Sequence, residues 1–354
     1  MPDAIIIGAG IIGSSIAWRL AQAGAAVTLL DAGTLGGEAS WAGAGMLAPG
    51  GEIAGRTAWT EFALESLALY PAFVRELEGE SRVAIDYRQC GAVELARTYA
   101  EWQELRTRRA VQEELGIRAE PIDGGLLYPD DALVDPRDVT RALRRACKKR
   151  RVRIREQIPA LAVKVTEDRV DVQTSRGALS AGAVVLAAGA WSGAIPVVRG
   201  GELVEIPASF PVRGHLLGYR LEPGSLGPIL RRGHTYVMQR SNGFTIAGTS
   251  SEQVGFNREL DQGIVADIHA RACKLLPRLR SAPEPEAWLG FRPATEDLEP
   301  RIGRLGDTRL WLAYGHYRNG ILLAPATAAR VSAEIIGLRP SSSGTGPYAP
   351  DAHR

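Results

Sequence analysis

Residues 4–13 read AIIIGAGIIG, an apolar run that leads directly into a glycine-rich turn. The GxGxxG pattern in this turn is weak evidence by itself. Here it opens a helical pattern over residues 14–24, and a second apolar strand, residues 27–30, follows and ends in Asp31. A strand, a glycine-rich turn, a helix and a second strand with an acidic end make up the dinucleotide-binding βαβ unit. The sequence therefore predicts that this segment binds a dinucleotide.

The three glycines of the turn have different tasks in such a unit. Gly8 permits the tight turn, Gly10 lets backbone amides approach a pyrophosphate, and Gly13 lets the helix pack closely on the strand. The phosphates then meet the positive end of the helix. Asp31 lies 18 residues after Gly13 and can accept hydrogen bonds from an adenosine ribose. The alternative is a glycine-rich turn in an unrelated α/β protein, and NAD and FAD are both open at this stage.

Composition limits the class of protein. A chain of 354 residues exceeds the size at which one hydrophobic core keeps growing, so we expect about two domains. The 45% of hydrophobic and 23% of charged residues are typical of globular proteins. A net charge of +2 supplies no basic excess for neutralising many phosphates, so we expect no nucleic-acid partner.

The cysteines predict neither a metal site nor a disulfide framework. Cys90, Cys147 and Cys273 are widely spaced, and none belongs to a CxxC pair. A reduced, cytoplasmic setting fits this usage. The N-terminus lacks the features of a signal peptide, and no window is long and apolar enough to span a membrane. We also expect identical chains to associate, in a number that the sequence does not give.

The first half of the chain alternates helical and strand patterns. Residues 33–51 are too rich in glycine and alanine for regular surface structure and suit backbone that lies against a flat ligand. An apolar run, residues 183–192, ends in a small-residue turn, which indicates a second passage of backbone under the same ligand. Helices are predicted over residues 57–77, 100–115 and 137–149, and short strands over residues 91–96, 152–155, 160–166 and 169–174.

The second half begins with an alternating pattern. Residues 203–250 alternate apolar and polar positions, as antiparallel strands with one covered face do. A helix over 261–276, a proline-rich hinge over 277–285, a strand over 309–313 and a helix over 321–336 follow. We therefore predict an α/β fold with a discontinuous Rossmann-like nucleotide domain (residues 1–80, 135–200 and 290–340), an antiparallel-sheet α+β substrate domain (81–134 and 201–289) and a frayed tail (341–354).

Five segments together resemble the flavoprotein amine and amino-acid oxidases of the D-amino-acid oxidase (DAO) type, in particular their glycine-oxidising branch, which serves bacterial thiamine biosynthesis. The resemblance covers nearly the whole chain. The segments are GAGIIG at 8–13, GGEASWAGAGMLAP at 36–49, VVLAAGAWS at 184–192, GFRPATEDLEPRIG at 290–303 and GHYRNGILLAPATA at 315–328.

The resemblance implies a non-covalently bound FAD, because no cysteine lies in residues 315–328, where relatives that link their flavin carry one. Asp31 replaces the glutamate that is usual in the family. Amides at the start of the last helix would stabilise negative charge on the reduced flavin. The implied cofactor-binding residues are Gly8, Gly10, Ile12, Gly13, Asp31, Ser40, Ala42, Gly43, Gly45, Met46, Val163, Ala188, Gly189, Trp191, Arg318, Asn319, Gly320, Ile321 and Leu322.

A small amino acid needs its carboxylate held and its amine left neutral. The resemblance makes Arg292 the bidentate fork for that carboxylate, with a phenol hydrogen bond from Tyr236. The alternative for Tyr236 is a core residue of its sheet. Arg318 matches a second family arginine, His316 is expected to shape the site rather than accept a proton, and Met46 would lie over the entrance.

The predicted reaction is oxidative deamination of glycine and other small amines, with hydride transfer to flavin N5 and no protein acid or base. The products would be glyoxylate, ammonia and, from dioxygen, hydrogen peroxide. The alternatives are an oxidase of sarcosine, D-alanine or D-proline, a flavin dehydrogenase with another electron acceptor, and a non-catalytic flavin-binding module. His215 and Ala294 depart from the usual family residues, and we expect them to affect substrate range.

Overall fold

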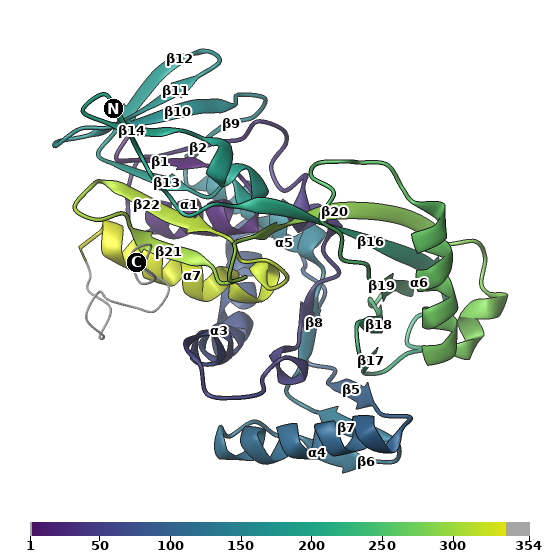
Figure 1. The fold of residues 1–354 in the computed structure, drawn as a ribbon. Helices are drawn as coiled ribbons and strands as arrows, with labels where there is room; N and C mark the ends of the chain where they lie inside the picture. Colours follow the sequence, from purple (N-terminus) through teal and green to yellow (C-terminus); the bar gives the residue numbers. More distant parts are fainter. Residues whose placement is uncertain (1, 338–354) are drawn as a thin grey trace.

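Four β-sheets organise residues 2–337, the part of the chain that the computed structural model describes (Figure 1). The predicted tail, residues 341–354, lies outside this part. In the first sheet, β1 (Ala4–Ile7) pairs in parallel with β2 (Val27–Leu30) and with β13 (Ala183–Leu186). The sheet has the order β21-β22-β13-β1-β2-β9 and is completed by β9 (Arg153–Arg155), β21 (Arg301–Arg304) and β22 (Leu310–Tyr314). This sheet takes its strands from three separate parts of the chain, as expected for the discontinuous domain.

Both faces of β1 are covered, which explains why its side chains are all apolar. Ile6 packs into a core with helices, whereas Ile5 and Ile7 join a core shared with a five-stranded sheet. This second sheet has the order β12-β11-β10-β14-β15. Its strands are β10 (Ala160–Val165), β11 (Val170–Thr174), β12 (Gly177–Ala181), β14 (Val197–Arg199) and β15 (Glu202–Val204).

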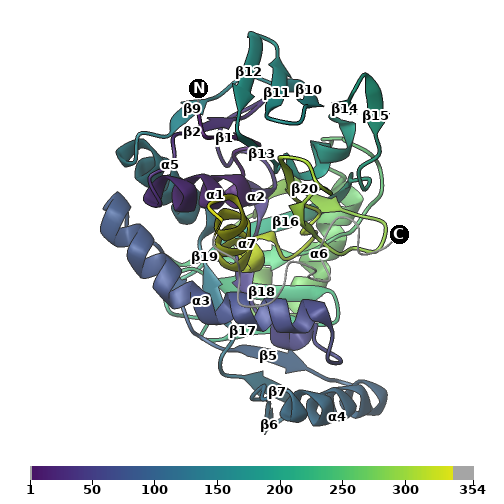
Figure 2. The same cartoon turned by 90° about the vertical axis from the view of Figure 1, so that its left-hand side faces the viewer.

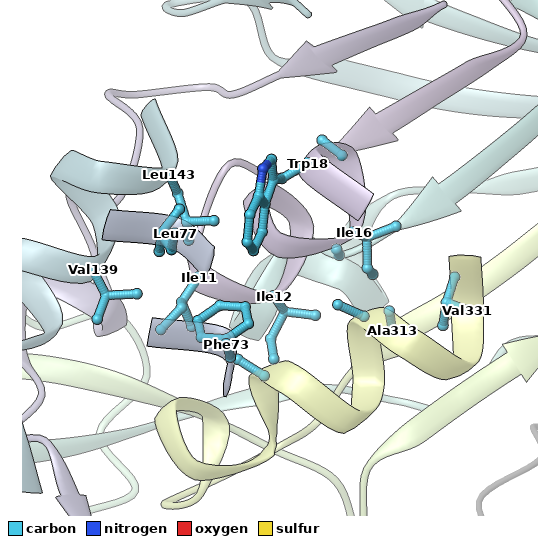
Figure 3. Close-up of a cluster of buried hydrophobic side chains, with 14 of the residues drawn as sticks. Ile11, Ile12, Ile16, Trp18, Phe73, Leu77, Val139, Leu143, Ala313 and Val331 are labelled. Carbon is cyan, nitrogen blue, oxygen red and sulfur yellow. The ribbon is translucent and has the colours of Figure 1, made fainter. Parts of the chain in front are cut away.

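Four helices form the core on the other face of the first sheet (Figure 2). They are α1 (Ile11–Gln22), α3 (Ala58–Ser81), α5 (Pro136–Lys149) and α7 (Gly320–Ile335). Figure 3 shows Trp18 of α1 close to Phe73 of α3, and their ring centroids lie 5.5 Å apart in an edge-on arrangement. The packing of its apolar face therefore fixes the position of α1, and with it the position of the glycine-rich turn at the start of this helix.

The third sheet is the predicted antiparallel platform, in the order β20-β16-β19-β18-β17-β5-β7-β6. Helix α6 (Gln262–Leu275) packs against it, and α4 (Tyr99–Glu114) lies with β5–β7 at the end of the molecule away from β10–β12 (Figure 1). Its strands are β5 (Ala92–Leu95), β6 (Glu120–Ile122), β7 (Gly125–Tyr128), β16 (Phe210–Arg220), β17 (Ile229–Arg232), β18 (Thr235–Gln239), β19 (Phe244–Gly248) and β20 (Glu286–Ala294).

Small elements connect these layers. A fourth sheet joins β3 (Met46–Leu47), β8 (Ala132–Val134) and β4 (Tyr87–Arg88). A four-residue helix, α2 (Ala39–Ala42), and three 3₁₀ helices complete the described structure: Pro49–Gly51, Gly189–Ala194 and Pro277–Ser281.

Several boundaries differ from the sequence-based expectation. Helix α1 begins at Ile11 rather than at residue 14, because Gly10 is its N-cap, so Gly13 lies in its first turn. The glycine-rich residues 33–51 do contain short regular pieces. Strand β20 was not predicted, because a glycine, an arginine and a proline interrupt its apolar pattern. It pairs with β16 in the third sheet. The domain boundaries stay a prediction.

Candidate active site

One cavity of about 890 Å³ lies between the first and third sheets. Its walls include the end of β2, the start of α1, the start of α7 and parts of β16, β18 and β20. It therefore joins the carboxyl ends of parallel strands, where nucleotides bind in open α/β sheets, to the antiparallel platform. The predicted site residues that line it are Gly8, Gly10, Ile12, Asp31, Ser40, Ala42, Gly43, Gly45, Met46, Ala188, Gly189, Trp191, Tyr236, Arg292, His316, Arg318, Asn319, Gly320 and Ile321.

Three predicted residues do not line the cavity. A Cβ atom on Gly13 would overlap the carbonyl oxygen of Gly8, so Gly13 serves the close packing of α1 on the turn. Leu322 is buried in the first turn of α7. The side chain of Val163 is fully buried in the core between the two sheets. The contact expected of Val163 was through its backbone, and it stays a prediction. Its neighbours Ile158, Pro159 and Ala160 reach the cavity instead, because they precede the pairing of β10 with β14.

The first turn of α1 offers free hydrogen-bond donors to the cavity. The N–H of Ile11 donates to Ser40 Oγ at 2.9 Å. The N–H groups of Gly10 and Ile12 have no acceptor among residues 2–337. Gly8 has φ +101°, and a Cβ there would overlap the carbonyl oxygen of Ala187, where β1 and β13 end side by side. An anionic group at this turn would meet unpaired amides and the positive end of a helix.

Asp31 holds the turn together while it faces the cavity. Its two carboxylate oxygens accept hydrogen bonds from the N–H groups of Ala9 and Gly33, each at 2.7 Å. Burial raises the pKa of Asp31 above its usual value, and these two hydrogen bonds act in the opposite direction. Each carboxylate oxygen can accept a second hydrogen bond, so the side chain can still bind a ribose hydroxyl.

The first turn of α7 forms the second set of free donors. Within the described chain, no acceptor faces the N–H groups of Gly320, Ile321 and Leu322. Pro325 lies inside this helix and cannot donate to the carbonyl of Ile321 four residues earlier. Two side chains of α3 form hydrogen bonds with the backbone of α7 near this break. Tyr70 Oη donates to the Ile321 carbonyl at 3.0 Å, and Ser66 Oγ bridges the Leu322 carbonyl (2.7 Å) and the Ala326 N–H (3.2 Å).

These features fit FAD. Two helix N-termini, about 300 residues apart in the chain, open into one long cavity, and glycine and alanine backbone forms much of its wall. The α1 end suits the pyrophosphate, and Asp31 the ribose. The α7 end suits a ring system on which negative charge develops. Which of the lining residues bind the cofactor stays a prediction.

Arg292 is held by the backbone and side chain of one loop. Its guanidinium donates to Ser250 O at 3.0 Å and to Thr249 Oγ1 at 2.7 Å. Burial lowers the pKa of Arg292, but arginine stays protonated in proteins because its ordinary pKa exceeds 12. The guanidinium has further N–H groups for a carboxylate. Tyr236 is buried, with its pKa raised to about 12 by burial, so its phenol remains a neutral donor.

Two strand glycines make room for this pair, and sequence reasoning missed both. A Cβ on Gly214 would overlap the guanidinium of Arg292, and one on Gly248 would lie 2.5 Å from Tyr236 Oη. Arg292 and Tyr236 thus lie flat on the backbone of β16 and β19. The available signal was a glycine within a strand pattern, which marks a close approach.

Gly214→Ala should displace Arg292 without removing it. The obstructed atoms are the end of a flexible side chain, so we expect the fold to be kept while the guanidinium moves away from its loop contacts. The expected result is about a tenfold to hundredfold rise in KM for an amino-acid substrate, equal to about 1.4 to 2.7 kcal/mol. Steady-state kinetics and FAD content measure it, with Gly227→Ala, where a Cβ meets open space, as control. An unchanged KM would contradict this role of Gly214.

His316 is buried and neutral. Its Nε2 lies 3.0 Å from Thr327 Oγ1, and burial lowers its pKa from 6.5 to about 3. This environment supports the expected shaping role over proton acceptance, because a base that stays unprotonated down to such pH holds a proton poorly. Arg318 is exposed and lies 3.5 Å from Glu52.

His316→Gln should change how stability depends on pH. Below pH 6.5 the unfolded chain binds a proton at His316 that the folded protein excludes down to about pH 3. The free energy of unfolding should therefore fall as pH drops through this window, by up to about 1.4 kcal/mol per pH unit. The variant should lose that part of the slope in urea unfolding at several pH values, whereas a substitution of the exposed His234 should keep it. An identical slope in His316→Gln would refute the assignment.

The two departures from the family pattern do not reach the cavity. His215 is fully buried and its Nδ1 lies 2.9 Å from Glu252 and 3.0 Å from Ser250 Oγ. Its Nε2 accepts from the Asp261 N–H at 3.2 Å. Ala294 is also buried and outside the lining. Neither residue lines the cavity, so neither is placed to contact a substrate there. His215 contacts Ser250 of the loop that holds Arg292, so its effect on substrate range would be indirect.

Two classes of site find no support within residues 2–337. No group of three or more histidine, cysteine, aspartate or glutamate side chains is arranged to hold a metal ion. No helix in this range combines the length and apolar character that crossing a membrane requires.

Comparison with known proteins gives a consistent picture. The family model DAO, FAD dependent oxidoreductase, matches residues 3–334. The chain is 33% identical to glycine oxidase of Bacillus subtilis over 93% of this chain and 92% of that protein. It is 35% identical to the bifunctional protein ThiO/ThiG of Synechocystis over 94% of this chain and 51% of that protein.

The structural comparison agrees. The crystal structure of glycine oxidase from Geobacillus kaustophilus matches with a TM-score of 0.92 and 28% identity, over 100% of this chain and 99% of that one. The predicted fold class, the predicted FAD cofactor and the resemblance on which they depend are confirmed. The chain belongs to the DAO family of FAD-dependent oxidoreductases.

Proposed function

We propose that this enzyme deaminates glycine and other small amines oxidatively, producing an imine that hydrolyses to an oxo acid, glyoxylate from glycine, and ammonia. The observation that carries the proposal is the convergence of Arg292 and Tyr236 on the cavity into which α7 opens. A fixed guanidinium and a neutral phenol bind a carboxylate. Family membership alone supports the oxidation of an amine or an amino acid, but it does not indicate that the substrate carries a carboxylate.

The protein contributes positioning rather than proton transfer. Arg292 and Tyr236 hold the substrate carboxylate, and the loop of Thr249 and Ser250 fixes the guanidinium, so the amine end can face the flavin-binding wall. Bound FAD would supply the two-electron acceptor at flavin N5, with dioxygen as the final acceptor giving hydrogen peroxide. The unpaired amides of Gly320 and Ile321 stabilise negative charge in their vicinity. His316 stays neutral and takes no proton.

Names of relatives support the choice of glycine. Proteins called glycine oxidase match most of this chain, and the ThiO/ThiG name supports the expected link to thiamine biosynthesis. The cofactor-binding and substrate-binding residues, the domain boundaries, the cytoplasmic location and the association of identical chains belong to this proposal as well.

A substrate panel tests the proposal. Glycine, sarcosine, D-alanine and D-proline are added to the purified holoenzyme, first without oxygen to follow bleaching of the flavin, then with oxygen to measure peroxide. We expect glycine to bleach the flavin and to yield peroxide. A preference for D-alanine or D-proline of more than about tenfold in kcat/KM, about 1.4 kcal/mol, would overturn glycine as the substrate. Bleaching without peroxide would establish the dehydrogenase alternative.

A further inference from the structure

A buried polar network lies behind the strand that carries Gly214. Gly214 lines the cavity and lies against the guanidinium of Arg292. Arg213 and His215 flank it in β16, and successive side chains of a strand point to opposite faces. Neither flanking residue lines the cavity, and 7% and 0% of their side chains are exposed. The strand therefore supports the substrate-binding arginine on one face and holds these two side chains on the other.

The carboxylate of Glu252 joins the members of this network. It accepts hydrogen bonds from Arg213 Nε at 3.0 Å, Ser250 Oγ at 2.7 Å and His215 Nδ1 at 2.9 Å. The backbones of Glu252 and Arg213 also pair through two hydrogen bonds, of 2.8 and 3.0 Å. Burial acts to raise the pKa of Glu252, but the hydrogen bonds from Ser250 and Arg213 hold this pKa below its usual value. Glu252 is therefore an ionised carboxylate with fixed partners.

Hydrogen bonds on both ring nitrogens determine the tautomer of His215. Its Nε2 accepts from the Asp261 N–H at 3.2 Å, so Nδ1 carries the proton and donates to Glu252. The backbone N–H of His215 donates to Ser250 Oγ at 2.9 Å. His215 thereby ties both ends of the segment 250–261, which lies between β19 and α6, to strand β16.

Ser250 connects the network to Arg292. Its backbone carbonyl accepts from the Arg292 guanidinium at 3.0 Å, and its hydroxyl belongs to the network behind β16. The adjacent Thr249 Oγ1 accepts from the same guanidinium at 2.7 Å. A shift of Ser250 would turn the guanidinium away from the direction in which its two parallel N–H groups can hold a carboxylate.

The network is complete, which favours a single arrangement of these side chains. Every buried polar side-chain atom of Arg213, His215, Ser250 and Glu252 has a hydrogen-bond partner. Burying charges costs free energy that an apolar cluster would not, but a fully satisfied polar network is rigid and specific. We propose that Arg213, His215 and Glu252 are positioning residues, which act through Ser250 to hold Arg292 in the orientation that binds the substrate carboxylate. This inference rests on the proposed function.

Glu252→Gln tests the proposal because charge and position predict opposite results. Burial lowers the pKa of Arg292 and the charge of Glu252 acts to raise it, so the two groups interact. Removing this negative charge would by itself favour a bound carboxylate. Loss of positioning would weaken binding instead. We expect acetate, titrated into the holoenzyme and followed by flavin absorbance, to bind the variant about tenfold more weakly than the wild type. Equal or tighter binding would overturn the proposal.

Ser250→Ala removes the connecting hydroxyl and changes no charge. We expect both variants to raise KM for the amino-acid substrate at least about fivefold and to keep kcat within about twofold, because the carboxylate contact exists before and during the reaction. Damage to the fold would instead lower FAD content and apparent kcat at unchanged KM, which would contradict positioning. Glu202→Gln, an exposed glutamate on β15, is the matched control and should change neither constant. If Glu252→Gln does not fold, Ser250→Ala decides.

A double-mutant cycle shows whether the network acts through Arg292. Ser250→Ala should lower kcat/KM at least about fivefold in the wild type and less than about twofold in Arg292→Ala. Equal losses in both backgrounds would contradict the proposal, and so would acetate that binds Arg292→Ala as tightly as the wild type. If the wild type oxidises no compound of the substrate panel, the proposed function fails, and the acetate titrations decide the inference. Absence of both turnover and acetate binding would overturn both.

Discussion

Arg292→Ala should lower kcat/KM for glycine by about a thousandfold while the protein keeps its FAD. Truncating one partner of a desolvated, hydrogen-bonded charge pair costs about 2 to 5 kcal/mol, and about 4 kcal/mol corresponds to a thousandfold. The substrate carboxylate would keep only Tyr236 as a fixed partner. Since that contact exists before and during the reaction, most of the loss should be in KM. Steady-state kinetics and the ratio of bound FAD to protein measure both quantities.

Two further variants sharpen this test. Arg292→Lys keeps the charge and loses the fork, so its kcat/KM should lie between those of the wild type and the alanine variant. Arg220→Ala removes an exposed arginine from the end of β16 and should leave both quantities unchanged. Loss of FAD together with an unchanged KM in Arg292→Ala would show that this arginine serves the cofactor.

Gly10→Asp should abolish FAD binding and leave the polypeptide folded. Gly10 is the N-cap of α1 with φ −67°, a position where aspartate is favoured, and a Cβ there meets only Ser40 Oγ at 3.4 Å. The new carboxylate would occupy the place where the pyrophosphate is expected and repel it. We expect FAD affinity to fall by at least about a hundredfold, about 2.7 kcal/mol. Flavin absorbance after dialysis and a titration of the apoprotein with FAD report the change.

Gly10→Asn separates charge from bulk, because it adds nearly the same volume without the negative charge. It should retain more FAD than Gly10→Asp. Thermal unfolding of the apoproteins should show the aspartate variant as stable as the wild type or more so, given the N-cap. A yellow Gly10→Asp protein would place the phosphates elsewhere in the cavity.

Local patterns made the cofactor end of the site predictable. The strand, turn and helix around Gly8 and Gly10 obey short-range rules, and so does the loop that leads into α7. Such rules concern the φ values, caps and periodicity of neighbouring residues. These rules do not predict where a residue lies when its position depends on the pairing of distant strands. The side chain of Val163 faces a core, whereas Ala160, three residues earlier, lies at the wall of the cavity.

The substrate end depends on long-range pairing that the sequence does not display. Arg292 could be named from the resemblance, but its partners Thr249 and Ser250 come from a loop about 40 residues earlier. The need for glycine at position 214 becomes clear only from the pairing of β16 with β20, which places Arg292 against it.

The hydrogen bonds between α3 and helix α7 have a consequence for electron transfer. Pro325 separates the first turn of α7 from the rest, and Ser66 and Tyr70 set the direction of that turn. Neither side chain belongs to the lining of the cavity. We therefore expect α3, none of whose residues line the cavity, to influence the reduction potential of a bound flavin through the direction of this turn.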